Sequence, residues 1–293
     1  MDTIVLYPSP GRGHLVSMVE LGKLILKHHP SFSVTVIITT TAGDTGYATT
    51  PYINSVTATT PSITFHHLPT LSSPLAHASA ANLPNLSFEI PRLNNPNLHQ
   101  ALLAISQSSN LKAFVIDFFC NAAFEVSTKL KIPTYYFFTS GAHGLAIFLY
   151  FPTIHRNITK SLKDLDRKFE IHIPGSPPIP VSDMPMAMFD RSSTTYQNFI
   201  ETANTMPKSA GIMINTFEML ESKSIKAILE GHYEVKASVM NALKESTIYS
   251  STPRGEGTSV PIFSPKKGIK PRVILFLFML RPMSHVTCFC PGI

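Results

Sequence analysis

The first feature of the chain that could do chemistry is a histidine in a glycine-rich turn. His14 stands in YPSPGRGHLV (7–16), between a short apolar run and a helix-like pattern. Three roles are open: the turn could cradle a phosphate, the imidazole could act as a base, or the ring could simply pack where a helix begins. A neutral imidazole takes a proton from a hydroxyl, and a nearby carboxylate orients the ring and stabilises its cation. The role of a base therefore requires a carboxylate that the fold brings close.

Asp117 is the candidate partner. His14 follows the apolar run TIVLY (3–7), and Asp117 is the last residue of AFVID (113–117). Continuous apolar runs of this length indicate parallel strands that are covered on both faces. The carboxyl ends of parallel strands share one edge of the sheet, where ligands bind. The sequence therefore places both residues at that edge, where an unpaired carboxylate in apolar surroundings would be costly.

The remaining elements alternate in the way that predicts an α/β fold with a doubly wound parallel sheet. Further strands are expected over 32–40, 63–68, 134–138 and 211–215. Helices are expected over about 15–29, 97–108, 121–130, from about 140, 193–205 and 217–230. Loops are expected over 39–51 and 69–97, and the Pro-rich segment 173–185 is expected to lack regular structure.

Several nucleotide and hydrolase motifs fit the sequence poorly. GRGHLV (11–16) has the first two glycines of the dinucleotide fingerprint, but Val16 stands at the third. The second strand ends in threonines (39–41) rather than in an acidic residue that would hold a ribose. The chain has neither the lysine of a phosphate-binding P-loop nor a Gly-x-Ser-x-Gly elbow. One half of a nucleotide-dependent oxidoreductase is therefore the least favoured alternative.

Composition argues against metal, nucleic acid and membrane partners. The histidine pairs at 28–29 and 66–67 and the cysteines at 288 and 290 lack metal-ligand spacing, so no metal site is expected. The net charge of +6 divides into +1 over 1–230 and +5 over 231–293, which leaves the body without the basic surface that nucleic acid requires. With three cysteines, no secretory leader and an apolar run (273–280) too short for a membrane span, a cytoplasmic location is expected.

Four motifs in the same order resemble the amino-terminal half of plant family 1 UDP-dependent glycosyltransferases, close to those acting on flavonoids and related phenolics. The segments are VLYPSPGRGHLVSMVELGKLIL, FVIDFFCNAAFEVSTKLKIPTYYFFTSGA, HIPGSPPIPVSDMP and GIMINTFEMLES, at 5–26, 114–142, 172–185 and 211–222. The resemblance runs over about 1–230. Because several separate motifs contribute, it is more specific than any one of them.

The resemblance implies a GT-B type fold, in which 1–230 form a Rossmann-like domain that binds the acceptor. It implies a UDP-sugar as co-substrate, with no cofactor, and transfer of the sugar, expected to be glucose, to a phenolic hydroxyl with inversion. His14 falls on the general base of the family, Asp117 on its partner, and Thr139 on a residue that touches the donor sugar in some members. Further substrate contacts are expected from Gly13, Phe118, Phe119, His143 and Met186.

The segment 231–293 departs from the family. It lacks the donor-binding signature containing HCGWNS, the chain has no tryptophan, and four prolines interrupt 253–271. We expect an irregular, atypical tail, as from a truncated or mis-spliced product, and little activity from this chain alone. A non-catalytic fragment that binds small phenolics, or that regulates full-length relatives by associating with them, is the alternative reading.

Overall fold

The computed structural model of the 293-residue chain describes residues 1–40, 49–71, 83–216, 218–231, 233, 248–250 and 272–277. The chain divides into two compact units, Met1–Phe137 and Phe138–Ile293, which are described separately below.

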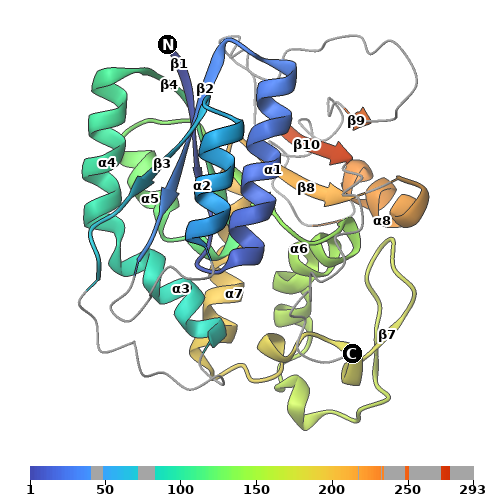
Figure 1. The fold of residues 1–293 in the computed structure, drawn as a ribbon. Helices are drawn as coiled ribbons and strands as arrows, with labels where there is room; N and C mark the ends of the chain where they lie inside the picture. Colours follow the sequence, from blue (N-terminus) through green and yellow to red (C-terminus); the bar gives the residue numbers. More distant parts are fainter. Residues whose placement is uncertain are drawn as a thin grey trace. The chain divides into compact units, whose positions relative to one another are not determined.

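The first unit is built on five parallel strands in the order β3-β2-β1-β4-β5 (Figure 1). They are β1 (Asp2–Tyr7), β2 (Phe32–Ile38), β3 (Ile63–His67), β4 (Asn110–Asp117) and β5 (Thr134–Phe138). From β1 the chain first builds outward to β2 and β3, and it then returns to add β4 on the other side. The switch point of this doubly wound sheet therefore lies between the carboxyl ends of β1 and β4, where such sheets bind ligands.

The strands of this sheet are apolar on both faces because helices cover them. In β1, Ile4, Val5, Leu6 and Tyr7 are all fully buried, which explains the continuous apolar run in the sequence. Helix α1 packs closely at Gly22, where an added Cβ would lie 3.2 Å from Leu6 and 3.3 Å from Val34.

The helices of the first unit are α1 (Arg12–His28), α2 (Thr50–Thr59), α3 (Leu83–Leu93), α4 (Asn95–Ser108) and α5 (Ala123–Lys129). In the view of Figure 1, α1 and α2 lie in front of the strands. The prediction of a loop over 69–97 is wrong from residue 83 onward, because α3 and the start of α4 occupy that part; positions 72–82 of it lie outside the described residues. Pro84 stands in the first turn, where a missing N–H costs nothing, and Pro91 lies only two residues before the helix ends.

The second unit contains α6 (Ala142–Asn157), α7 (Thr194–Thr205), α8 (Glu218–Glu230) and β8 (Gly211–Thr216). Strand β8 pairs in parallel with β10 (Arg272–Leu277), which pairs in parallel with β9 (Ile248–Ser250). By its sequence the apolar run over 273–280 is either a strand or an irregular segment, and the structure has a strand over 273–277. The segment EVKASVMNALKES (234–246), which its sequence allows to form one helix, lies outside the described residues.

The Pro-rich segment holds slightly more regular structure than expected. Strand β7 (Ile179–Pro180) pairs antiparallel with β6 (Glu170–Ile171), although each has only two residues. The short 3₁₀ turns among the described residues are Phe118–Cys120, Leu162–Asp164, Val181–Asp183, Met186–Met188 and Met206–Lys208. No helix in the described ranges is both long enough and apolar enough to cross a membrane.

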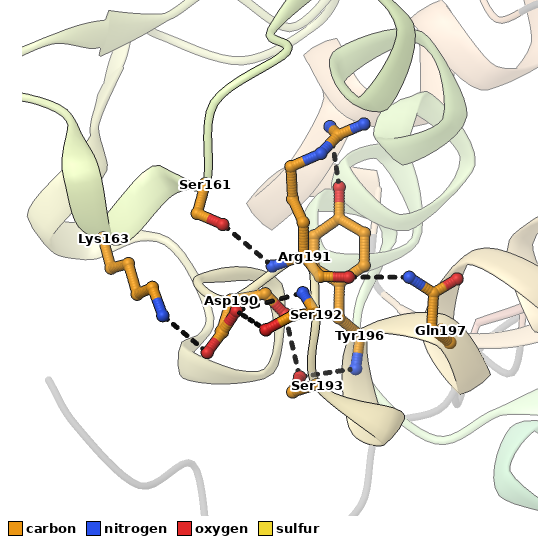
Figure 2. Close-up of polar contacts among 8 residues, drawn as sticks. All are labelled: Ser161, Lys163, Asp190, Arg191, Ser192, Ser193, Tyr196 and Gln197. Carbon is orange, nitrogen blue, oxygen red and sulfur yellow. Dashed lines mark hydrogen bonds and ion pairs between the residues drawn. The ribbon is translucent and has the colours of Figure 1, made fainter.

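A polar cluster fixes the irregular chain between α6 and α7 (Figure 2). Nη1 of Arg191 donates to the carbonyl oxygens of His155 and Ile158 at 2.9 and 2.7 Å, where α6 ends. A cation at this end complements the helix dipole. Next to it, the hydrogen bond from Lys163, at 2.7 Å, and those from neighbouring groups lower the pKa of Asp190 to about 2.

Candidate active site

His14 is presented by the turn that joins β1 to α1. Pro8 and Pro10 lack backbone N–H groups and so cannot continue a strand ladder. Gly11 then adopts a φ of 120°, in the region that glycine occupies without strain, and its carbonyl oxygen accepts the N–H of Leu15 at 3.2 Å. His14 consequently lies in the first turn of α1, beyond the carboxyl end of β1.

Asp117 ends β4 beside that turn and is fully buried. Its Oδ2 accepts a hydrogen bond from His14 Nδ1 at 2.7 Å, and its Oδ1 accepts the backbone N–H of Phe119 at 3.1 Å. The second bond holds the carboxylate in place, because each oxygen has its own donor. The structure thus brings together the two residues that the sequence placed at one edge of the sheet, 103 positions apart.

The pair sets the protonation of the imidazole. Burial lowers the pKa of His14, but the charge of Asp117 and the hydrogen bond to it raise this pKa by more, so the net shift is upward. A carboxylate can only accept, so the neutral ring carries its proton on Nδ1 and leaves Nε2 as an acceptor. Nε2 has no hydrogen-bond partner in the part of the chain that the structure describes, and the His14 side chain is 28% exposed. The ring can therefore take a proton from a bound hydroxyl.

Aromatic rings flank this imidazole. Phe119 meets His14 edge-on at a centroid distance of 5.5 Å, and Phe118 lies against Phe119 at 3.9 Å. Phe88 of α3, which is 3% exposed, packs edge-on against Phe119 at 4.9 Å. Sequence reasoning named Phe118 and Phe119 but missed Phe88, because it assigned that segment to a loop.

Two other buried ionisable groups, the Cys120 thiol and the Tyr7 hydroxyl, are not reactive near neutral pH. Burial, and then the charge of Asp117, raise the pKa of the fully buried Cys120 thiol well above its ordinary value. Burial likewise raises the pKa of Tyr7. Both groups therefore stay protonated near neutral pH. Among the described residues, no three His, Cys, Asp or Glu side chains gather closely enough to hold a metal ion.

The other predicted contact residues fall into two groups. Gly13 is exposed in the first turn of α1, and a Cβ there would meet no atom within 4 Å. Thr139 follows β5 and is half-buried, His143 is half-buried in the first turn of α6, and Met186 is 70% exposed. These last three lie in the second unit, so the structure does not place them relative to His14.

A cavity of about 270 Å³ opens beside the turn that carries His14. It lies at the carboxyl ends of β1, β2 and β3, and hydroxyl groups contribute much of its wall. Sequence reasoning noted the threonines that follow β2 only as a failure to match a ribose-binding acid. The lining residues are Pro8, Ser9, Pro10, Gly11, Leu15, Ile38, Thr39, Thr40, Thr49, Thr50 and His67.

The fold and the site define the first unit as a doubly wound α/β domain with a histidine–carboxylate pair at its switch point. No family model matches the chain. Curated relatives do: UDP-glycosyltransferase 88B1 of Stevia rebaudiana is 52% identical over 228 residues, covering 78% of this chain and 48% of the relative. The anthocyanidin 5,3-O-glucosyltransferase of a Rosa hybrid cultivar is 50% identical over 241 residues, covering 78% and 49%.

Solved structures of plant UDP-glycosyltransferases also match the chain. Phytolacca americana UGT2, complexed with UDP-2fluoro-glucose and pterostilbene, matches with a TM-score of 0.71 and 28% identity, covering 80% of this chain and 52% of that one. Medicago truncatula UGT71G1, complexed with UDP-glucose, matches with a TM-score of 0.67 and 29% identity, covering 80% and 50%. Over the residues that match, the chain is homologous to plant UDP-glycosyltransferases, and the predicted GT-B type α/β fold is confirmed. The chain spans about half the length of the curated relatives it matches.

Proposed function

We propose that this chain provides the acceptor-binding half of a UDP-dependent glycosyltransferase that acts on flavonoids or other phenolics. The observation that carries the proposal is the 2.7 Å contact between His14 Nδ1 and a buried carboxylate, at the switch point of the sheet. The names of the relatives support the acceptor class, since they include an anthocyanidin and an isoflavone glucosyltransferase. UDP-glucose is the proposed donor on the same grounds.

In the proposed reaction, Nε2 of His14 accepts the proton of the acceptor hydroxyl. The acceptor oxygen forms a bond to the anomeric carbon as the bond from that carbon to UDP breaks, which inverts the anomeric centre. UDP leaves with the bonding electron pair, and the proton stays on the imidazole. Asp117 stabilises the resulting imidazolium, because its carboxylate already faces Nδ1.

The remaining contacts are proposed from the resemblance and from their positions. Phe118 and Phe119 provide an aromatic wall next to His14, which suits a flat phenolic ring. Thr139 is proposed to contact the donor sugar. Gly13, His143 and Met186 are proposed as weaker acceptor contacts; Gly13 leaves space in the turn.

The 293 residues by themselves are proposed to turn over slowly. Holding the acceptor and the activated donor together accounts for much of the catalytic advantage of such enzymes, and this sequence has no counterpart of the donor-binding signature and no tryptophan. The second candidate function is a binder of small phenolics without catalysis, which the aromatic wall of Phe118 and Phe119 next to His14 would equally suit.

A fusion distinguishes the two candidates. Residues 1–230 are joined to the unmatched half of the Stevia rebaudiana relative and supplied with UDP-glucose and a flavonol, and glucoside is measured by mass. The proposal predicts product that falls about 10²- to 10⁴-fold in His14→Ala, the range for loss of a general base. The exposed His66 is the matched control, and His66→Ala retains activity. Equal product from the fusion and its His14→Ala variant would refute the proposed base, and flavonol binding without product would favour the binder.

A further inference from the structure

The amino terminus of α6 carries an unusual cap, a carboxylate from a distant part of the chain. Oε2 of Glu221 accepts the backbone N–H of Ala142 at 2.8 Å, and Oε1 accepts that of His143 at 2.9 Å. The hydroxyl of Thr216, the last residue of β8, donates to Oε2 of the same carboxylate. Helices α6 and α8 pack together in the second unit, as Figure 1 shows. One side chain therefore joins α6, α8 and β8.

The residue that would ordinarily cap α6 cannot do so. Gly141 occupies the N-cap position and has no side chain, so the first N–H groups of the helix lack a local acceptor. Glu221, 79 residues after Ala142, takes that place. A negative charge here is also favoured by the helix dipole.

Glycine at position 141 is required by this contact rather than by its backbone angles. Its φ of −76° suits any residue. An added Cβ, however, would lie 2.5 and 2.6 Å from the two oxygens of Glu221. The carboxylate and the missing side chain are therefore two parts of one arrangement. Helix α8 accommodates it with a local departure from helical geometry at Glu221, where φ is −129° and ψ is 30°.

We infer that Glu221 is a positioning residue, which holds the turn formed by residues 139–141 and the first turn of α6 in one geometry. The importance of this turn for catalysis rests on the proposed function, in which Thr139 contacts the donor sugar. The contact between Glu221 and the amino terminus of α6 does not depend on that proposal. A fixed turn presents the Thr139 hydroxyl without an ordering cost at the moment of reaction. The same contact also closes the α6 amino terminus to the donor phosphates, because its N–H groups already have an anionic partner.

Hydrogen exchange on the 293-residue chain tests the inference directly. Glu221→Ala is expected to speed exchange of the Ala142 and His143 amides at least tenfold, while amides in α7 keep their rates. Glu170→Gln is the matched control. This substitution also removes a carboxylate from the second unit, but at the exposed Glu170. Unchanged exchange rates at residues 142–143 in Glu221→Ala would overturn the inference. An equal rise in exchange rates across α6 and α7 would also overturn it, because that would indicate general destabilisation.

A double-mutant cycle provides a second measurement that does not depend on amide assignments. Gly141→Ala is expected to lower the urea midpoint of unfolding in the parent chain, because the new methyl group displaces the carboxylate. In the Glu221→Ala background the same substitution is expected to lower the midpoint by less than half as much. Additive shifts would contradict the inference. Neither measurement involves His14 or an acceptor, so a failure here leaves the proposed function standing, and a failure of the fusion assay leaves this contact standing.

Discussion

Replacing Asp117 by asparagine is the perturbation that reports most fully on the candidate site. The carboxylate is fully buried and accepts two hydrogen bonds, one on each oxygen. Asparagine has nearly the same shape but only one acceptor oxygen. If that oxygen keeps the N–H of Phe119, the amide NH₂ faces Nδ1 of His14. The ring must then accept at Nδ1 and carry its proton on Nε2, so it can no longer take a proton from a substrate.

The expected cost is large enough to measure. A buried hydrogen bond to a charged group is replaced by one between neutral groups, and the difference between the two is about 1–1.5 kcal/mol of unfolding free energy. The pKa of His14 should also fall below its ordinary value of 6.5, because only burial, which lowers it, is left once Asp117 no longer raises it. The fusion assay should lose about as much activity in Asp117→Asn as general acid–base catalysis contributes, roughly 10²- to 10⁴-fold.

The loss of unfolding free energy in Asp117→Asn should depend on pH with a definite sign. In the folded parent the pKa of His14 is raised, so the pairing contributes stability that is fully present below pH 6.5 and is lost as the pH rises through the folded pKa. The difference in unfolding free energy between the parent and Asp117→Asn should consequently be larger at pH 6 than at pH 8. Urea unfolding at the two pH values measures it.

Long-range ¹H–¹⁵N spectra of the histidine rings provide the decisive assay. We expect neutral His14 to carry its proton on Nδ1 in the parent and on Nε2 in Asp117→Asn, with the His66 ring unchanged in both proteins. An unaltered tautomer together with an unaltered His14 pKa in the variant would refute the reasoning.

Three further predictions concern residues outside the histidine–carboxylate pair. Gly11→Ala should cost about 1–3 kcal/mol, because φ is 120° there; an unchanged urea midpoint would contradict this. Phe88→Ala should cost about 3–5 kcal/mol and weaken flavonol binding measured by calorimetry, since Phe88 packs against Phe119; full affinity would count against the aromatic wall. Arg191→Met should raise the pKa of His155, which burial and then the Arg191 charge lower in the parent. The parent therefore loses stability from His155 as the pH falls below 6.5, and the variant should lose less; an unmoved histidine titration in NMR would exclude this coupling.

Much of the fold could be predicted from the sequence because its parallel strands are covered on both faces. Continuous apolar runs such as TIVLY mark those strands, and the chain order then assigns His14 and Asp117 to one edge. The pairing could be inferred without knowing any distance, since the carboxyl ends of parallel strands meet at that edge.

The parts that could not be predicted depend on contacts between distant residues. Helix α3 escaped notice because Pro84 and Pro91 are turn signals when read locally, although neither position interrupts the helix, and Phe88 was missed with it. The Glu221 cap joins residues almost 80 positions apart, and no local pattern announces it. Gly141 carries no signal of its own in the sequence, whereas its role is to leave room for a side chain from α8.

The central claim is that His14 takes the proton of a bound phenol, and the absorbance of a bound flavonol tests it most directly. Deprotonation of a flavonol shifts its absorption to longer wavelength, so ionisation of the ligand can be followed on the 293-residue chain without any donor. The account predicts that the bound flavonol ionises at lower pH than the free compound, and that His14→Ala abolishes this shift while His66→Ala preserves it. The same shift in His14→Ala as in the parent would contradict the account.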